Sequence, residues 1–283
     1  MRIIAGKFRS RKLLSPRDAE TTRPIPDRVK ESIFNLLRGH FEGATVLDGF
    51  AGTGAIGLEA ISRGAERVVF VEKDRRAADL LDRNIASLGC EESAEVLRAD
   101  VLGPAALTRC PKPVDMIFLD PPYPLVLDPD GWARVTRQLS RLITANLSEK
   151  GFAILRTPWP FRHVTVTDSE GHVVPLGDAR NPFDYKGVLR SDLPPPSGRR
   201  YKGQRDVIDA GIDEESWEGD AVDVPRIIQE SRAAEEVLNA VPDQAVPGGF
   251  RIEREDVDLS IEGARGPETH EYASQAVHLY MRA

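Results

Sequence analysis

The chain has 283 residues, of which 41% are hydrophobic and 29% charged, and its formal net charge is −7. That length and apolar content suffice for one large or two small domains with a buried core. No apolar run approaches the roughly 18 residues of a membrane span, and no secretory signal follows the first charged residues. Two cysteines, Cys90 and Cys110, cannot form a disulfide framework, so we expect the reducing environment of the cytoplasm.

Charge is distributed unevenly along the chain. Residues 1–38 carry ten basic and four acidic side chains, a net charge of +6, whereas residues 205–270 carry six arginines and eighteen acids, a net charge of −12. A basic segment suits contact with nucleic-acid phosphates, although a solvated charged surface has the same composition. The candidate nucleic-acid-binding residues are Arg2, Lys7, Arg9, Arg11, Lys12, Arg23 and Arg28.

The predicted elements alternate between strand and helix through the first half of the chain. Residues 1–24 read as short strands or an arm, and a helix follows with Pro26 near its first turn and Gly39 past its end. Strands are then expected at 45–47, 67–71, 95–97, 114–119 and 152–155, and helices at 54–63, 74–88 and 130–146. Because short apolar strands that alternate with helices are typical of buried parallel sheets, this pattern predicts a doubly wound α/β fold.

The pattern stops at Pro158 and returns only at the end of the chain, where residues 275–281 read as a strand with a possible partner at 257–261. The intervening sequence is proline-broken and acidic, with one helical candidate at 225–240, which predicts a partly flexible insertion. The expected organisation is a basic arm and helix at 1–40, a core at 41–160, an acidic insertion at 161–255, and strands at 256–283 that return to complete the sheet.

A glycine-rich turn follows the first strand, where the sequence from Asp48 to Gly57 is DGFAGTGAIG. Glycines allow a sharp turn and a close approach of the backbone to a ligand. Glu72 ends the second strand at the position of a ribose-binding acid, and Asp100 follows the third strand, where an acid can accept hydrogens from an adenine amine. The motif by itself suits a dinucleotide or S-adenosylmethionine equally well.

Asp120, Pro121, Pro122 and Tyr123 follow the fourth strand and form the candidate catalytic motif. The Asp120 carboxylate and the Pro121 carbonyl can accept the two hydrogens of an exocyclic amine, whose nitrogen lone pair is otherwise delocalised into the base. Two prolines fix the backbone, and Tyr123 can stack on the base. This motif favours methyl transfer from S-adenosylmethionine over nicotinamide-dependent oxidoreduction, which leaves it unexplained. The five histidines have no ligand spacing, so no metal site is expected.

With these motifs the chain resembles the bacterial 16S ribosomal RNA guanine-N2 methyltransferases of the RsmD type. The resemblance covers roughly residues 1–158 and the closing strand. It rests on residues 2–7 (RIIAGK), 22–31 (TRPIPDRVKE), 48–65, Glu72, 120–123 and 272–280. Two departures are visible: the segment 159–255 has no recognised counterpart, and an extra proline interrupts Arg23–Asp27 where a hydroxyl residue is expected.

The resemblance implies a Rossmann-like class I methyltransferase fold with a mostly parallel sheet and an antiparallel final strand. It implies S-adenosylmethionine as cofactor and a guanine of ribosomal RNA, within an assembling small subunit, as target. We further expect the enzyme to be a monomer. The candidate cofactor-binding residues are Asp48, Phe50, Gly52, Gly54, Glu72, Lys73, Asp100 and Val101. Two alternatives stay open: an adenine or cytosine amino-methyltransferase of DNA, and a non-catalytic RNA-binding assembly factor on the same fold.

Overall fold

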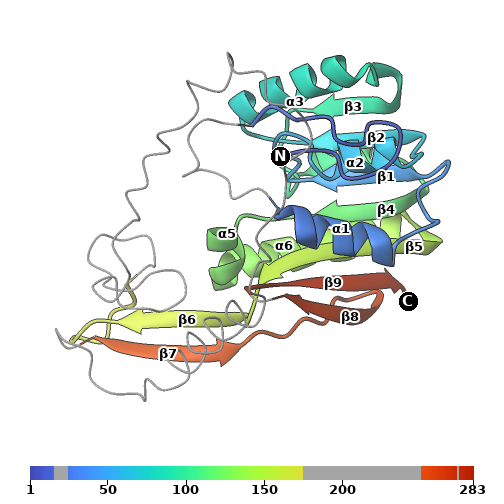
Figure 1. Ribbon diagram of the computed structural model, residues 1–283. Helices are drawn as coiled ribbons and strands as arrows, with labels where there is room; N and C mark the ends of the chain where they lie inside the picture. The colour runs from blue at the N-terminus through green and yellow to red at the C-terminus, as the bar shows by residue number, and fades with distance from the viewer. Residues whose placement is uncertain (16–24, 175–249, 273) are drawn as a thin grey trace, which may run out of the picture. The chain divides into compact units, whose positions relative to one another are not determined.

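The computed structural model describes residues 1–15, 25–174, 250–272 and 274–283 of the chain (Figure 1). The chain divides into two compact units, one made of Met1–His163 with Glu255–Ala283 and the other of Val164–Arg254. Arg23 and the expected helix at 225–240 lie outside the described residues. Within the described ranges, no helix combines the length and the apolar character needed to cross a bilayer.

The first unit contains a seven-stranded sheet with the order β3-β2-β1-β4-β5-β9-β8. Its strands are β1 (Thr45–Gly49), β2 (Arg67–Val71), β3 (Ala94–Leu97), β4 (Val114–Leu119), β5 (Leu147–Pro158), β8 (Ala264–Tyr272) and β9 (Gln275–Arg282). β1 to β5 pair in parallel, whereas β9 runs antiparallel to both β5 and β8. The predicted parallel sheet with an antiparallel final strand is therefore confirmed.

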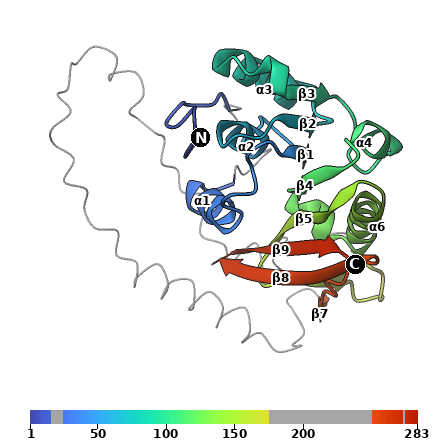
Figure 2. The ribbon, with the colours of Figure 1, turned by 90° about the vertical axis from the view of Figure 1, so that its right-hand side faces the viewer.

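Helices cover both faces of this sheet. They are α1 (Asp27–Leu36), α2 (Gly57–Ser62), α3 (Arg75–Leu88), α4 (Pro104–Arg109), α5 (Tyr123–Leu127) and α6 (Pro129–Ala145), with a short 3₁₀ turn, η1 (Glu91–Ser93), before β3. Figure 2 shows α1, α2 and α3 on one face and α4 and α6 on the other. This is the doubly wound arrangement that alternating strands and helices predict.

Local sequence signals set the ends of the long helices. Asp74 caps α3 by accepting a hydrogen bond from Ala77 N, and Gly89 ends the helix in a left-handed conformation with φ 64°. Asp128 caps α6 in the same way, through Gly131 N, before Pro129 opens the helix. These residues explain why the helices expected at 74–88 and 130–146 begin, and why α3 ends, within one residue of the observed bounds.

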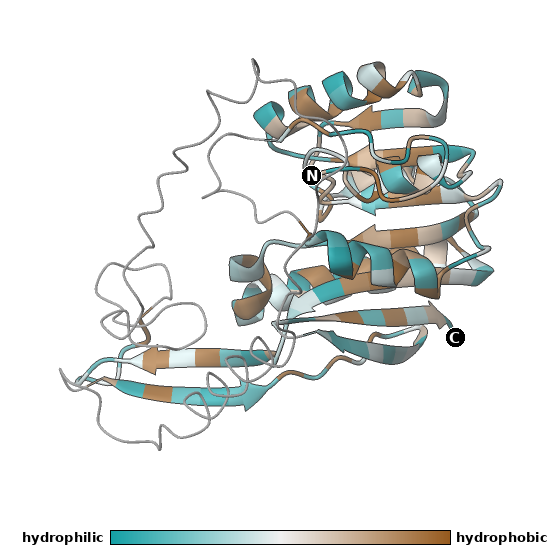
Figure 3. Ribbon diagram, in the orientation of Figure 1, coloured by the Kyte–Doolittle hydropathy of each residue, from teal (hydrophilic) through white to brown (hydrophobic). Residues whose placement is uncertain are grey.

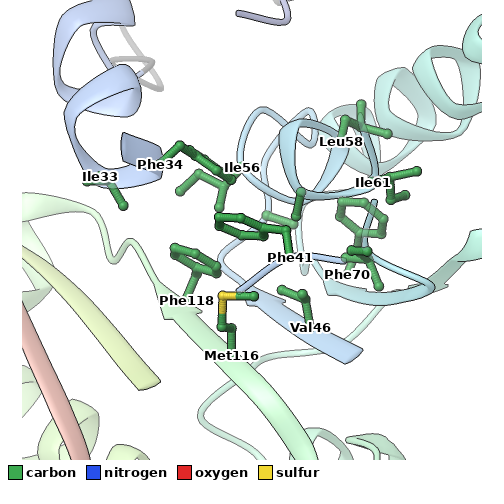
Figure 4. Packing of buried hydrophobic residues seen from close by; sticks show 14 of the residues in the cluster. Ile33, Phe34, Phe41, Val46, Ile56, Leu58, Ile61, Phe70, Met116 and Phe118 are labelled. Atoms are coloured by element: carbon green, nitrogen blue, oxygen red, sulfur yellow. The ribbon is translucent and has the colours of Figure 1, made fainter. Parts of the chain in front are cut away.

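The central strands β1, β2 and β4 are apolar and buried along most of their length because helices cover both faces of the sheet (Figure 3). Between α1 and the sheet, the ring of Phe34 stacks on those of Phe41 and Phe118, with centroids 4.8 and 5.9 Å apart (Figure 4). Met116 and Val46 from the two central strands belong to the same cluster. This packing anchors α1 to β1 and β4, the strands whose ends carry the glycine turn and the Asp120 motif.

The expected strand at 257–261 is wrong, because the partner of β9 is β8, seven residues further along. Asp258 forms a local turn instead: its carboxylate accepts hydrogen bonds from both Ser260 N (2.9 Å) and Ser260 Oγ (2.8 Å). Such side-chain bonds compete with a strand ladder. The sequence of β8 is polar and contains Gly266 and Pro267, so it lacks the apolar alternation from which strands are predicted.

The N-terminal segment, residues 1–15, packs against α2 instead of projecting from the fold. Ile3 is fully buried, and Ile4 N and Ala5 N donate to the Glu59 carboxylate at 2.7 and 3.0 Å. Lys7 N donates to the carbonyl of Ser62, the last residue of α2. The segment is thus part of the first unit, and its backbone is held by the helix that follows the glycine turn.

A separate two-stranded sheet joins β6 (Arg162–Thr167) and β7 (Arg251–Asp256). Val164, Val166 and Ile252 form a small buried cluster between these strands, with Phe250 against it. Neither strand is expected from the sequence, which loses its apolar pattern after Pro158. Two short half-buried strands bury too few side chains to produce a clear apolar pattern.

Candidate active site

The candidate site lies where the direction of strand order reverses, because β1 has β2 on one side and β4 on the other. Ligands of open α/β sheets bind beyond the carboxyl ends of the strands at such a point. The two central strand ends are joined there, since Asp120 N, after β4, lies 3.4 Å from Gly49 O at the end of β1. The glycine turn and the Asp120 motif are therefore neighbours in space.

The glycine turn adopts the backbone conformation for which glycine is suited. Gly52 and Gly54 have φ of 56° and 89°, and Phe50 has φ 60°, which is uncommon for a residue with a side chain. A Cβ on Gly54 would lie 2.4 Å from Leu81 Cδ1, whereas one on Gly52 would meet nothing within 4 Å. The turn is thus packed on α3 at Gly54 and open at Gly52.

Two carboxylates fix the shape of this turn. Asp48 is buried at the end of β1 and accepts a hydrogen bond from Gly57 N, the first residue of α2, at 2.8 Å. Glu72, just beyond β2, accepts from Gly52 N and Asp74 N, both at 2.7 Å. A carboxylate can accept about four hydrogen bonds, so Glu72 retains acceptor capacity. The neighbouring Lys73 is exposed.

Burial raises the pKa of Asp48 to about 7, although its bond from Gly57 N opposes the shift. The nearby carboxylates of Asp120 and Glu72 raise this pKa further. Like charges held close together disfavour one another's ionised forms. Three carboxyl groups therefore lie near one another at these strand ends.

Asp100 and Val101 follow β3 at the same edge of the sheet. Leu102 N donates to the Asp100 carboxylate at 3.0 Å, and Arg134 of α6 lies 3.8 Å from its other oxygen. The Val101 carbonyl accepts a 2.7 Å bond from the buried amide of Gln138. Asp100 is thus held with much of its side chain accessible to a ligand.

The motif after β4 turns directly into α5, which begins at Tyr123. Pro121 is buried and Pro122 exposed. The Pro122 carbonyl accepts a 2.9 Å bond from Leu125 N, so that carbonyl is engaged within the turn. Asp120 and Tyr123 both face Arg156 of β5, whose Nε and Nη2 donate to the two Asp120 oxygens at 2.6 and 2.8 Å.

Arg156 and Gln275 are residues of this site that the sequence analysis missed. Arg156 Nη1 donates to Tyr123 Oη at 3.2 Å and to Gln275 Oε1, at the start of β9, at 2.6 Å. Burial alone would lower the pKa of Arg156, but the adjacent Asp120 carboxylate outweighs it and raises the pKa. One signal in the sequence could have identified Arg156, which is a charged residue directly after the apolar run Phe152–Leu155.

The described basic candidates are all exposed and belong to the N-terminal segment or α1. Arg2 pairs with Asp27 at 3.2 Å, and Arg11 Nη2 donates to the carbonyl of Ser87 at 2.6 Å. Lys7, Arg9, Lys12 and Arg28 are also exposed. Arg23 lies outside the described residues.

Asn84 of α3 connects this basic segment to the glycine turn. Its amide nitrogen donates to the carbonyls of Leu14 and Thr53, at 3.1 and 2.9 Å, and its oxygen accepts from Leu14 N at 2.7 Å. The described end of the basic segment therefore lies beside the turn at the candidate site. Within the part of the chain that the structure describes, no group of histidine, cysteine and acidic residues has the arrangement of a metal site.

Among curated proteins, the chain is similar to Ribosomal RNA small subunit methyltransferase D of Haemophilus influenzae, with 43% identity over 124 residues. The protein of the same name from Escherichia coli K12 is 40% identical over 123 residues. The matched stretches cover 44% of this chain in both cases, and 64% and 60% of the two relatives. The chain thus matches less than two thirds of the length of these relatives.

Among solved structures, the chain is similar to a candidate methyltransferase, yhhF, from Escherichia coli, with a TM-score of 0.54 and 20% identity. That alignment covers 100% of this chain and 97% of the other. At this identity the likeness shows the fold, which is the Rossmann-like class I methyltransferase fold predicted from the sequence. A family model described as Conserved hypothetical protein 95 matches residues 1–157, more than half of the chain. The chain therefore belongs to the Conserved hypothetical protein 95 family.

Proposed function

We propose that the chain transfers a methyl group from S-adenosylmethionine to the exocyclic N2 of a guanine in 16S ribosomal RNA. One observation carries this proposal: Asp48, Glu72 and Asp100 lie at or just after the carboxyl ends of β1, β2 and β3, at the edge of the sheet where the Asp120 motif follows β4, in a member of this family. The relatives named Ribosomal RNA small subunit methyltransferase D support small-subunit RNA as the substrate. The proposed enzyme is a monomer that acts on the assembling small subunit. It works in the cytoplasm, because its RNA substrate lies there.

The residues at the strand ends fit the proposed cofactor. Glu72 is held by two backbone amides and keeps acceptor capacity for ribose hydroxyls, and Asp100 is placed for the adenine amine. The open side of Gly52 allows the cofactor to approach the backbone closely. We propose that it also contacts Phe50, Gly54, Lys73 and Val101. S-adenosylmethionine, when bound, supplies a methyl group already activated on a sulfonium.

The chain's own contribution to the reaction is alignment and acceptance of hydrogen bonds from the amine. The Asp120 carboxylate accepts one N–H and the Pro121 carbonyl the other, which favours a pyramidal nitrogen with its lone pair directed at the methyl carbon. Tyr123 stacks on the base, a contact worth roughly 1–3 kcal/mol. As the methyl group transfers, Asp120 is the acceptor for the proton that leaves the amine.

Transfer of labelled methyl groups to small-subunit particles, naked 16S RNA and DNA, measured in parallel, tests the proposal. We expect N2-methylguanosine in the RNA products, and replacement of Asp120 by Ala should lower the rate by a factor of about 10²–10⁴. Cofactor affinity, measured by calorimetry, should stay nearly unchanged. Asp79→Ala, which removes an exposed carboxylate on α3, is the matched control.

Three outcomes would count against the proposal. Methylation of DNA but not RNA would favour the DNA amino-methyltransferase alternative. RNA binding without any transfer would favour the assembly-factor alternative. If Asp120→Ala kept more than about a tenth of the wild-type rate, the assignment of Asp120 would be wrong.

A further inference from the structure

Arg156 is the most extensively bonded side chain at the candidate site. Its guanidinium donates to both oxygens of Asp120, to the hydroxyl of Tyr123 and to the side-chain oxygen of Gln275. It also lies 5.5 Å from the centroid of the Tyr123 ring. The side chains of Arg156 and Asp120 are only 10% and 16% exposed. One arginine therefore contacts both polar side chains of the motif that follows β4.

The geometry of this cluster restricts the orientation of Asp120. Two parallel N–H···O bonds from one planar guanidinium hold a carboxylate in a single orientation. Each Asp120 oxygen uses one lone pair in these bonds, so each retains one for another donor. Arg156 thus leaves the carboxylate able to accept a hydrogen bond from an amine while removing its freedom to rotate.

Gln275 in turn restricts Arg156. The bond from Nη1 to Gln275 Oε1 is 2.6 Å long and buried, and it joins residues 119 positions apart in the sequence. Gln275 opens β9, and its backbone is paired with Pro158 at the end of β5. β9, the last strand in the chain, therefore contributes to the site through the side chain of Gln275.

Stability alone is a weak explanation for this arrangement. A largely buried ion pair loses much of its Coulombic attraction to the cost of desolvating both partners. What such a pair does supply is a fixed geometry. A misplacement of about 1 Å in a reacting group can reduce a rate by about 100-fold, so orientation is the property of value at this position.

We propose that Arg156 is a positioning residue that orients the Asp120 carboxylate toward the target amine, and that Gln275 holds Arg156 in place. This inference rests on the proposed function, because it assigns Asp120 the role of acceptor for the amine. It adds that β9 contributes to the site as well as to the sheet. In this proposal Arg156 acts on the amine only through Asp120.

The kinetic test compares Arg156→Ala, Arg156→Lys and Gln275→Ala with the wild-type protein. We expect Arg156→Ala to lower kcat about 100-fold, with KM for RNA and cofactor affinity changed less than about threefold. Arg156→Lys should recover only a small part of the rate, because an ammonium keeps the charge but lacks the planar fork. Gln275→Ala should lower kcat by about tenfold, because Arg156 keeps its bonds to Asp120.

Matched controls separate positioning from a general loss of structure. Arg67→Ala removes an exposed arginine, paired with Glu95, at the opposite edge of the sheet, and should leave kcat unchanged. Added methylguanidinium should restore part of the rate of Arg156→Ala and none of the rate of Asp120→Ala. Rescue of this kind is not expected if the substitution merely unfolds the protein. If Arg156→Ala does not fold, Gln275→Ala tests the same cluster from β9.

Nuclear magnetic resonance tests the cluster independently of catalysis. A guanidinium held on both sides should give a resolved, slowly exchanging Nε–H resonance for Arg156 in the wild-type protein. Asp120→Ala should abolish that protection, and Gln275→Ala should reduce it. A rapidly exchanging resonance in the wild-type protein would overturn the inference.

The outcomes distinguish this inference from the proposed function. If the wild-type protein methylates RNA and Arg156→Ala does so at an equal rate, the inference is overturned and the proposed function stands. A higher KM for RNA with unchanged kcat would indicate that Arg156 contacts the substrate, which also overturns it. If the wild-type protein transfers no methyl group to any nucleic acid, the proposed function fails and the inference fails with it.

Discussion

We propose that Glu72 has two roles at the candidate site that one carboxylate can perform together. Its oxygens accept hydrogen bonds from Gly52 N and Asp74 N, which ties the glycine turn to the residues that follow β2. The remaining lone pairs are available for the ribose of the proposed cofactor. Orientation by backbone donors gives this acid a defined direction before any ligand binds.

Replacing Glu72 by Ala should weaken S-adenosylmethionine binding by roughly 1.5–3 kcal/mol, the range for a hydrogen bond to a charged group. Isothermal titration calorimetry measures this change directly. Glu66→Ala, which removes an exposed acid just before the opposite end of β2, should leave the affinity unchanged. An unaltered affinity in Glu72→Ala would remove this residue from the binding site.

Glu59 and Lys30 form an ion pair whose side chains are both 0% exposed, with Nζ 3.3 Å from Oε2. Glu59 also accepts from the backbone of residues 4 and 5 and from Arg63, while Lys30 donates to the carbonyl of Arg2 at 2.6 Å. Burial lowers the pKa of Lys30, and the Glu59 carboxylate opposes that shift. This cluster attaches the N-terminal segment and α1 to α2.

Replacing Glu59 by Ala should reduce the free energy of unfolding by about 3–5 kcal/mol, because Lys30 and two backbone amides then lose their buried acceptor. Urea denaturation followed by circular dichroism gives this value. The double variant Glu59→Leu with Lys30→Met should be less destabilised than Glu59→Ala, because the fully buried charge of Lys30 is removed together with its partner. A loss under about 1 kcal/mol for Glu59→Ala would contradict this assignment.

At the scale of elements, β9 is joined to both of its neighbours by one buried histidine. His278 Nε2 lies 2.8 Å from Thr157 Oγ1 on β5, and Nδ1 lies 2.9 Å from Thr269 Oγ1 on β8. Because Thr157 donates its own proton to the Pro158 carbonyl, we assign Nε2 as the protonated nitrogen. Burial lowers the pKa of His278 to about 4.

This lowered pKa predicts an acid-sensitive sheet. Between pH 6.5 and pH 4 the unfolded chain binds a proton at His278 that the folded chain does not, so stability falls as the pH falls through this window. The free energy of unfolding should drop by roughly 2 kcal/mol more between pH 7 and pH 5 in the wild-type protein than in His278→Gln. Urea denaturation at the two pH values gives both numbers, and equal drops in the two proteins would contradict the prediction.

At the scale of the whole molecule, the net charge of −7 conceals two opposed regions, a basic one at residues 1–38 and an acidic one at residues 205–270. The structure describes most of the basic region and shows Arg9, Arg11 and Lys12 exposed on a segment whose end lies beside the glycine turn. An RNA held by these side chains would lie next to the candidate site. Contacts with phosphates release counterions and make binding salt-dependent.

Replacing Arg9, Arg11 and Lys12 together by Gln should raise KM for RNA and reduce the log–log salt slope by about two to three. The measurement is KM at several salt concentrations. A matched triple replacement of the exposed Arg67, Arg109 and Arg141 should leave the slope unchanged. An unchanged slope in the first variant would show that this segment is not at the RNA interface.

The sequence by itself determined the α/β class, the five parallel strands, the long helices with their caps, and the positions of the glycine turn and the Asp120 motif. These features depend on interactions between residues close in sequence: apolar periodicity, N-cap carboxylates, and glycines at positive φ. A polar strand such as β8 escaped prediction, because its place in the sheet depends on pairing with β9 and not on its own composition.

Only the tertiary structure decided which distant side chains meet. The bond between Arg156 and Gln275 spans 119 residues, and the N-terminal segment is bound to Glu59 across more than 50. The residues next to each partner in the sequence do not identify the other partner. A strand pairs with the segment that the fold brings beside it, and a buried carboxylate is bound by the donors that the fold places near it. The orientation of Asp120 thus depends on the assembled sheet, which brings Arg156 beside it. The presence of an acid at that strand end, by contrast, can be predicted from the sequence.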